Sequence, residues 1–154
     1  YAKPEFDWLQ MSAIRHGLVL GLDVSIYAKL EFRSAQISEI SRGLEQGLDI
    51  SVYANHEYDW EQMAHIRKGL EQNLDISWYA KPEFNENQMC QICLGLEKSL
   101  DVSWYAKPEY TWRQMEEIRL GLEANIDVSL YSYSGFTDGQ MEQFRSSLIW
   151  AKSN

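Results

Sequence analysis

The chain has 154 residues and a formal net charge of −9, and 45% of its residues are hydrophobic and 24% charged. This composition is typical of a folded domain with a core and argues against a disordered chain. No apolar run approaches the ~18 residues needed to span a bilayer, which argues against a membrane protein. The acidic balance argues against nucleic-acid binding, because phosphate contacts need clustered Lys and Arg.

The chain begins at Tyr1, without a Met and in the middle of a repeated phrase, which predicts a piece of a longer protein. Two cysteines do not form a disulfide framework, so we expect a reducing, cytoplasmic location.

The sequence repeats itself with a period of 26 residues. The six copies start at a shared tyrosine: Tyr1, Tyr27, Tyr53, Tyr79, Tyr105 and Tyr131. A glutamine recurs in all six copies: Gln10, Gln36, Gln62, Gln88, Gln114 and Gln140. A glycine recurs in five: Gly17, Gly43, Gly69, Gly95 and Gly121. An aspartate also recurs in five: Asp23, Asp49, Asp75, Asp101 and Asp127. These columns indicate what each unit needs in order to stack on its neighbours.

The first predicted element of each copy is a helix of roughly 13–14 residues. Asp7 occupies the N-cap position and Gln10 follows three residues later, which is the spacing of a capping box. The preceding Phe6 is placed to form a hydrophobic staple. Only Arg33 breaks the column of capping residues. Most copies carry Gly or Asn in the column of Gly21, which predicts a left-handed C-terminal cap.

The second element, over 75–82, has two interpretations. Asp75 can cap a helix of one to two turns that places Ile76, Tyr79 and Ala80 on one face and ends at Pro82. The aromatic and β-branched residues of the same stretch also suit a short strand. We favour the helix, since a strand would leave an exposed edge at each end of a stack.

A single unit cannot bury its apolar stripe, but stacked units can. The sequence therefore predicts an all-α, solenoid-like repeat array forming one domain over residues 1–154, with an α/β repeat as the alternative. Gly17 and Gly69 lie in the middle of the long helix, where we expect a neighbouring backbone to approach closely. The last copy has Ser147 in the glycine column and lacks the second element, so we expect a C-terminal cap closed by Ile149 and Trp150.

The one motif with chemical connotation is 90–93, in which Cys90 and Cys93 share a predicted helix. This spacing occurs in redox and zinc sites, but no second cysteine pair accompanies it. We interpret the two cysteines as ordinary thiols, with a metal or redox role as the alternative, and we expect no cofactor. The three histidines fall in three different columns, which predicts no shared catalytic geometry.

The recurring polar residues have structural interpretations. Asp23 and Asp75 each stand at a predicted helix start and are expected to be N-caps rather than acid–base carboxylates. The arginines in the column of Arg15 are expected to pair with these aspartates. Gln10 and Gln62 exceed what capping requires, which predicts a second hydrogen bond to the adjoining unit.

Tryptophans occupy two variable columns, which are the candidate binding positions. Trp8, Trp60 and Trp112 stand at the first helical position in alternate copies. Trp78 and Trp104 stand just before the tyrosine of consecutive copies, where they form either an apolar strip for a partner or part of the core between units.

The unit D-x-x-Q-M-x-x-I-R-x-G-L-E-x-x-L-D-V-S-x-Y-A resembles a repeat of uncharacterised proteins from gut Firmicutes that are often linked to mobile elements. The resemblance covers the whole chain. It implies a repeat fold and transfers no catalytic or binding residue.

Together these features predict a protein that is not an enzyme: an interaction or scaffold module with a protein partner, binding neither nucleic acid nor membrane. One alternative is glycan binding through the exposed rings of Trp8, Trp60 and Trp112. Another is an acidic inhibitor or nucleic-acid mimic, which requires the negative charge to gather on one face.

Overall fold

The computed structural model describes residues 5–154, and every regular element in that range is helical. Tyr1, which opens the first copy, lies outside the described residues. The α-helices are α1 (Trp8–Val19), α2 (Ser34–Glu45), α3 (Trp60–Glu71), α4 (Glu86–Glu97), α5 (Trp112–Glu123) and α6 (Asp138–Ser153). The 3-10 helices between them are η1 (Val24–Ile26), η2 (Ile50–Val52), η3 (Ile76–Trp78), η4 (Val102–Trp104) and η5 (Val128–Leu130). No strand occurs in residues 5–154, so the all-α repeat fold is confirmed and the α/β alternative is wrong.

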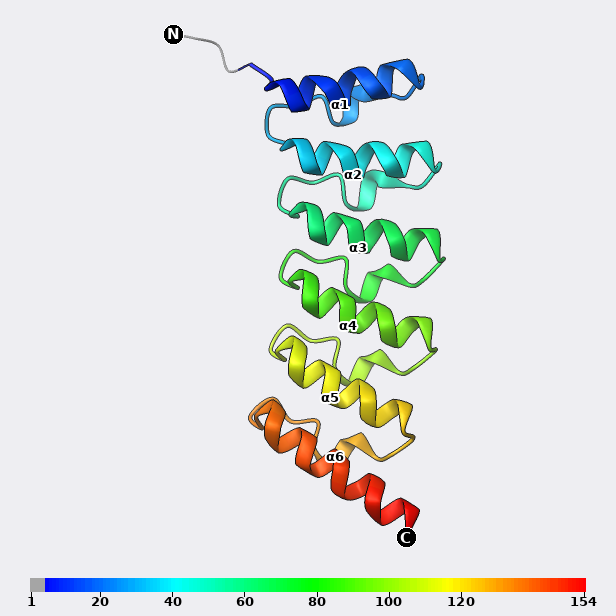
Figure 1. Cartoon of the computed structure of the whole chain (residues 1–154), viewed down its shortest axis with the longest axis vertical. Helices are drawn as coiled ribbons and strands as arrows, with labels where there is room; N and C mark the ends of the chain where they lie inside the picture. Colours follow the sequence, from blue (N-terminus) through cyan, green and yellow to red (C-terminus); the bar gives the residue numbers. More distant parts are fainter. Residues whose placement is uncertain (1–4) are drawn as a thin grey trace. The chain divides into compact units, whose positions relative to one another are not determined.

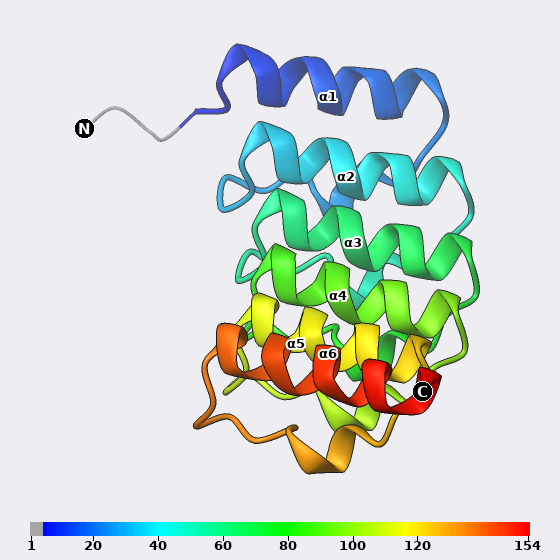
Figure 2. The same cartoon turned by 60° about the horizontal axis from the view of Figure 1, so that its bottom comes forward.

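The chain divides into two compact units, residues 1–73 and 74–154. In the first unit α1 packs on α2 and α2 on α3; in the second α4 packs on α5 and α5 on α6. Figures 1 and 2 show the helices of each unit side by side, with a connecting segment that returns from the end of one helix to the start of the next. The single domain expected over residues 1–154 stays a prediction. No α-helix within residues 5–154 has the length and apolar character that crossing a membrane requires.

Helices α1 and α3 to α6 start with the expected reciprocal capping bonds, and α2 has one of the two. The Asp7 carboxylate accepts from Gln10 N at 2.7 Å, and the Gln10 Oε1 accepts from Asp7 N at 2.8 Å. Arg33 makes no side-chain cap, yet the Gln36 Oε1 still accepts from Arg33 N at 2.8 Å. The glutamine therefore makes its capping hydrogen bond even where the N-cap side chain is not an acceptor for the helix N–H groups.

Helices α1 to α5 end in the same turn, with a left-handed residue two positions beyond the helix. In the first copy Gly21 has φ 72°, and the Leu22 N–H donates to the Gly17 carbonyl at 2.9 Å, which is the Schellman pattern. The other copies use Gly47, Asn73, Ser99 and Asn125, all with positive φ. This residue stops each of these helices at 12 residues, one or two fewer than the sequence predicted.

The last helix departs from this rule. In α6 the left-handed column holds Ala151, and the helix continues to Ser153 for 16 residues in place of a second element. The Lys152 ammonium donates to the carbonyls of Ala124 and Asn125 at the end of α5. Trp150 is 69% exposed, so the expectation that it closes the apolar end is wrong; Lys152 attaches the helix end instead.

The second element is a single 3-10 turn, shorter than the helix that we expected. Asp23 caps it, accepting from Ser25 N at 3.0 Å and from the Ser25 hydroxyl at 2.6 Å. The turns η1 and η2 end at the same point as the others although Leu30 and His56 replace proline after them. Proline is therefore not what terminates the element.

Candidate functional site

The recurring glutamine joins neighbouring copies of the repeat. The Gln10 side-chain amide donates to the Phe32 carbonyl at 2.6 Å, and Gln36 donates to the Tyr58 carbonyl at the same distance. Gln88 and Gln114 repeat this bond in the second unit. Gln62 makes both capping bonds at the start of α3. The predicted second hydrogen bond explains why glutamine is used rather than glutamate, since only the amide can donate.

The glycine column makes room for a tyrosine. A Cβ on Gly17 would overlap the hydroxyl of Tyr27 in the next copy, and Gly43 stands in the same relation to Tyr53. Gly69 lies buried at the same place in α3. The expected close approach of a backbone is therefore wrong: a buried phenol from the following copy fills the space.

The aspartate column is a set of caps, as predicted. Asp23 and Asp75 each accept from the backbone N–H two residues later, and the Ser25 hydroxyl and N–H hold the pKa of Asp23 below its usual value. These aspartates do not pair with the arginine column, contrary to the expectation.

The arginines instead bridge to the preceding helix. The Arg67 Nε donates to the Glu39 carboxylate at 2.9 Å, and the guanidinium also reaches Glu71 at 2.9 Å. Glu39 is only 3% exposed. In the second unit Arg119 donates to Gln91 at 2.8 Å and Arg145 to Glu117 at 2.7 Å. The acceptor lies 28 residues before the arginine each time, a separation that the repeat period alone does not reveal.

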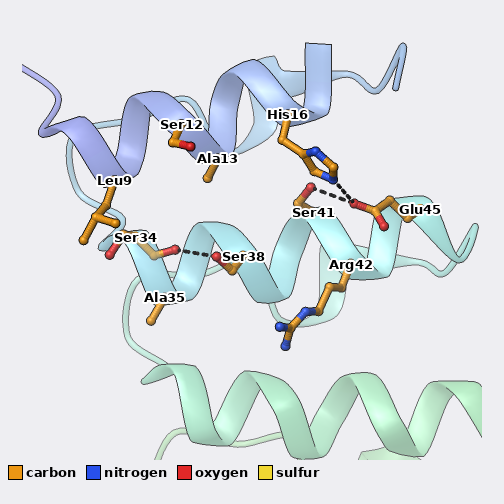
Figure 3. Close-up of a pocket in the computed structure, with 10 residues that line it drawn as sticks. All are labelled: Leu9, Ser12, Ala13, His16, Ser34, Ala35, Ser38, Ser41, Arg42 and Glu45. Carbon is orange, nitrogen blue, oxygen red and sulfur yellow. Dashed lines mark hydrogen bonds and ion pairs between the residues drawn. The ribbon is translucent and has the colours of Figure 1, made fainter. Parts of the chain in front are cut away.

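We call the interface between two consecutive α-helices a joint. The α1–α2 joint lacks this bridge and contains a pocket. Ala13 replaces the acceptor and Ser41 replaces the arginine. Ser34 stands where α3 has Trp60. These small side chains leave a pocket of about 560 Å³ between the two helices (Figure 3), lined by Leu9, Ser12, Ala13, His16, Ser34, Ala35, Ser38, Ser41, Arg42 and Glu45.

A carboxylate and an imidazole meet at one end of this pocket. The Glu45 carboxylate lies 3.4 Å from the His16 Nε2 and 3.5 Å from the Ser41 hydroxyl. Arg42 extends from the side of α2 that faces away from α1 (Figure 3) and forms an ion pair with Glu39. The pocket therefore presents a carboxylate, an imidazole and several hydroxyls.

The Tyr27 hydroxyl belongs to the same region. Tyr53, Tyr105 and Tyr131 donate their hydroxyls to the carbonyl of Glu39, Gln91 or Glu117 at 3.1–3.2 Å. The Tyr27 hydroxyl is buried, and no hydrogen bond to a main-chain carbonyl holds it. Burial raises the pKa of Tyr27, a side-chain hydrogen bond with Ser41 lowers it and the charge of Glu45 raises it.

Five of the six tryptophans fall into two groups. Trp8 and Trp60, on α1 and α3, are 74% and 47% exposed. Trp112 on α5 is half-buried, and the Arg113 guanidinium lies 5.2 Å from its ring centroid. In the second unit Trp78 is half-buried and Trp104 is 37% exposed, each at the end of a 3-10 turn.

Cys90 and Cys93 both lie on α4, where Cys90 is half-buried and Cys93 buried, and they form no disulfide. Within residues 5–154 no group of three or more His, Cys, Asp or Glu side chains is arranged to hold a metal ion.

Neither a family model, nor a curated protein, nor a solved structure matches this chain. The resemblance to repeat proteins of gut Firmicutes stays a hypothesis.

Sequence reasoning missed the α1–α2 pocket. The available signal was the simultaneous change of three columns to small residues, at Ala13, Ser34 and Ser41, in two adjoining copies.

Proposed function

We propose that the protein is a non-enzymatic interaction module that binds a protein partner. The observation that carries the proposal is a row of apolar side chains on the second unit. Trp78, Trp104 and Leu130 end consecutive 3-10 turns at 26-residue intervals, and Trp104 and Leu130 are exposed.

Other side chains fill the core beside this row. The buried positions beside it are filled by Val102 and Tyr105 in one copy and by Val128 and Tyr131 in the next. Tryptophan recurring at a surface is typical of binding hot spots, because a large apolar ring gains much on leaving water.

The repeated polar residues support a role without catalysis. Gln88 and Gln114 join neighbouring copies of the repeat, and Asp101 and Asp127 cap the 3-10 turns. Each recurring polar residue of the second unit thus has a structural task, and the variable positions are left for recognition.

The test is a pull-down from a lysate of the native host, with the captured proteins identified by mass spectrometry. Trp78→Ala/Trp104→Ala should lose the partner that the wild type captures. The matched control is Trp150→Ala, which removes an exposed tryptophan outside the row.

Circular dichroism and thermal unfolding must show that the double variant is folded. Equal capture by the folded double variant and the wild type would contradict the proposed surface, and an empty wild-type lane would contradict the proposed function.

The exposure of Trp8 and Trp60 favours glycan binding as a second candidate, since an open indole face suits stacking on a sugar ring. Binding on a carbohydrate array that disappears with Trp8→Ala/Trp60→Ala would support this function. A blank array for the wild type would remove it.

A further inference from the structure

Arginine occupies a defined place in the joints between helices. In the α2–α3 joint the Arg67 guanidinium lies between Glu39 on one helix and Glu71 on its own, and it also donates to Gln46 at 3.3 Å. In the α4–α5 joint Arg119 reaches Gln91 and Glu123 in the same way. The fold thus builds a largely buried site for a guanidinium in the joint and fills it from its own chain.

In the α1–α2 joint this site has lost its guanidinium but kept an acceptor. Glu45 stands in the column of Glu71 and Glu123, both of which pair with the arginine four residues earlier. Four residues before Glu45 stands Ser41, whose hydroxyl is 3.5 Å away. The nearest basic group to Glu45 is His16, at 3.4 Å on an exposed side chain.

The Tyr27 phenol also differs from its equivalents. Tyr53, Tyr105 and Tyr131 each donate to a main-chain carbonyl of the preceding helix, whereas no such bond holds the buried Tyr27 hydroxyl. Burial raises the pKa of Tyr27, a side-chain hydrogen bond with Ser41 lowers it and the charge of Glu45 raises it. Burial also raises the pKa of Tyr53, and there the charge of Arg67 lowers it. The serine that replaces the arginine is thus the neighbour of the phenol in this joint.

We infer that the α1–α2 pocket binds an arginine side chain that a partner protein inserts beside Glu45 and Ser41. The inference rests on the proposed function in that the arginine is carried by a protein. Its guanidinium takes the place that Arg67 holds in the α2–α3 joint.

The charges around the pocket suit this occupant. Arg42 is paired with Glu39 and extends away from α1 (Figure 3), so it does not oppose a second guanidinium directly. The incoming group displaces His16 from Glu45, exchanging a single imidazole contact for a planar fork of five donors. Lysine offers three donors around a single point of charge and lacks the planar fork that matches a carboxylate.

The experiment is an NMR titration of the full ¹⁵N-labelled chain with N-acetyl-arginine amide. The neutral control probe is N-acetyl-citrulline amide, which has almost the same shape without the charge. We expect saturable shifts at the backbone amides of His16, Ser41 and Glu45 with the arginine probe and none with citrulline.

Two variants sharpen the test. Ala13→Glu/Ser41→Arg rebuilds the native bridge inside the pocket, and Glu45→Gln removes the carboxylate without changing its shape. Each should weaken the arginine probe by at least about tenfold, since hydrogen bonds to charged groups are the strong ones. Because Glu45→Gln is nearly isosteric, it decides the matter if the double variant does not fold.

Unchanged affinity in folded Glu45→Gln, or shifts confined to other acidic side chains, would overturn the inference and leave the Trp78–Trp104 row untouched. An empty lysate pull-down overturns the proposed function, whatever the titration shows. The two failures are therefore separable.

Discussion

The α1–α2 and α2–α3 joints are built from the same repeat and differ in one set of contacts, the arginine bridge. Both have the glutamine that reaches the next copy and the glycine that receives a tyrosine. Only the second has the arginine bridge, from Arg67 to Glu39, where the first has Ser41 and Ala13. The helices still pack together in both joints.

The comparison separates two tasks within a joint. The glutamine and tyrosine contacts are common to both joints, whereas the buried arginine bridge is present in only one of them. A repeat protein can therefore open a pocket in one joint without changing its fold.

The largest expected effect is on the bridged joint. Arg67→Ala leaves the carboxylate of Glu39, which is 3% exposed, with only the Arg42 pair. Removing one partner of a buried ion pair typically costs 3–5 kcal/mol, and the remaining pair reduces this to about 3 kcal/mol. Urea unfolding monitored by circular dichroism measures the loss. Ser41→Ala, the same column in the unbridged joint, should cost under about 1 kcal/mol.

Gly43→Ala tests the layer that the two joints share. The new Cβ would overlap the Tyr53 hydroxyl, so overpacking should cost about 2 kcal/mol after the better helix propensity of alanine is included. Gly17→Ala should cost the same, because Tyr27 stands in the same relation to it. Unequal losses in urea unfolding would show that the joints differ in more than the bridge.

Ala13→Glu and Ser41→Arg convert the first joint into the second. Each single change introduces a charge without its intended partner, whereas the two together rebuild the bridge. A double-mutant cycle should give a favourable coupling of about 1 kcal/mol or more. Zero coupling would mean that the helices of this joint are not in the register that the bridge needs.

The smallest effects concern the buried tyrosines and their response to alkaline pH. Burial raises the pKa of Tyr27 and Tyr53 above 10, so the folded state holds the neutral phenol. That stability is present below about pH 10, the unfolded tyrosine pKa, and is lost as pH rises through the folded value. Tyr53→Phe should flatten the alkaline fall in unfolding free energy and also cost about 1 kcal/mol at pH 7 for its bond to Glu39. Tyr27→Phe should flatten the fall with a smaller cost at pH 7, since no hydrogen bond to a main-chain carbonyl holds its hydroxyl. Equal costs at pH 7 would contradict the difference between the joints.

Much of the fold was predictable. The 26-residue period gave the copies, and Asp7 with Gln10 gave the helix start. The second bond of Gln10 was predicted from the absence of glutamate in its column, and the structure shows its acceptor, Phe32. The length of the second element was overestimated. It is a single 3-10 turn, and Tyr27 and its equivalents stand at its C-cap.

The sequence by itself determined the elements and their ends, because caps, boxes and left-handed turns act between residues two to five apart. Only the tertiary structure decided which side chains meet across a joint. Arg67 and Glu39 are 28 residues apart, one period plus two, and Tyr27 reaches back to Gly17 from the following copy. These offsets depend on how far one helix is shifted along the next. That shift is set by side-chain packing, and a period in the sequence fixes which copies are neighbours but not their register.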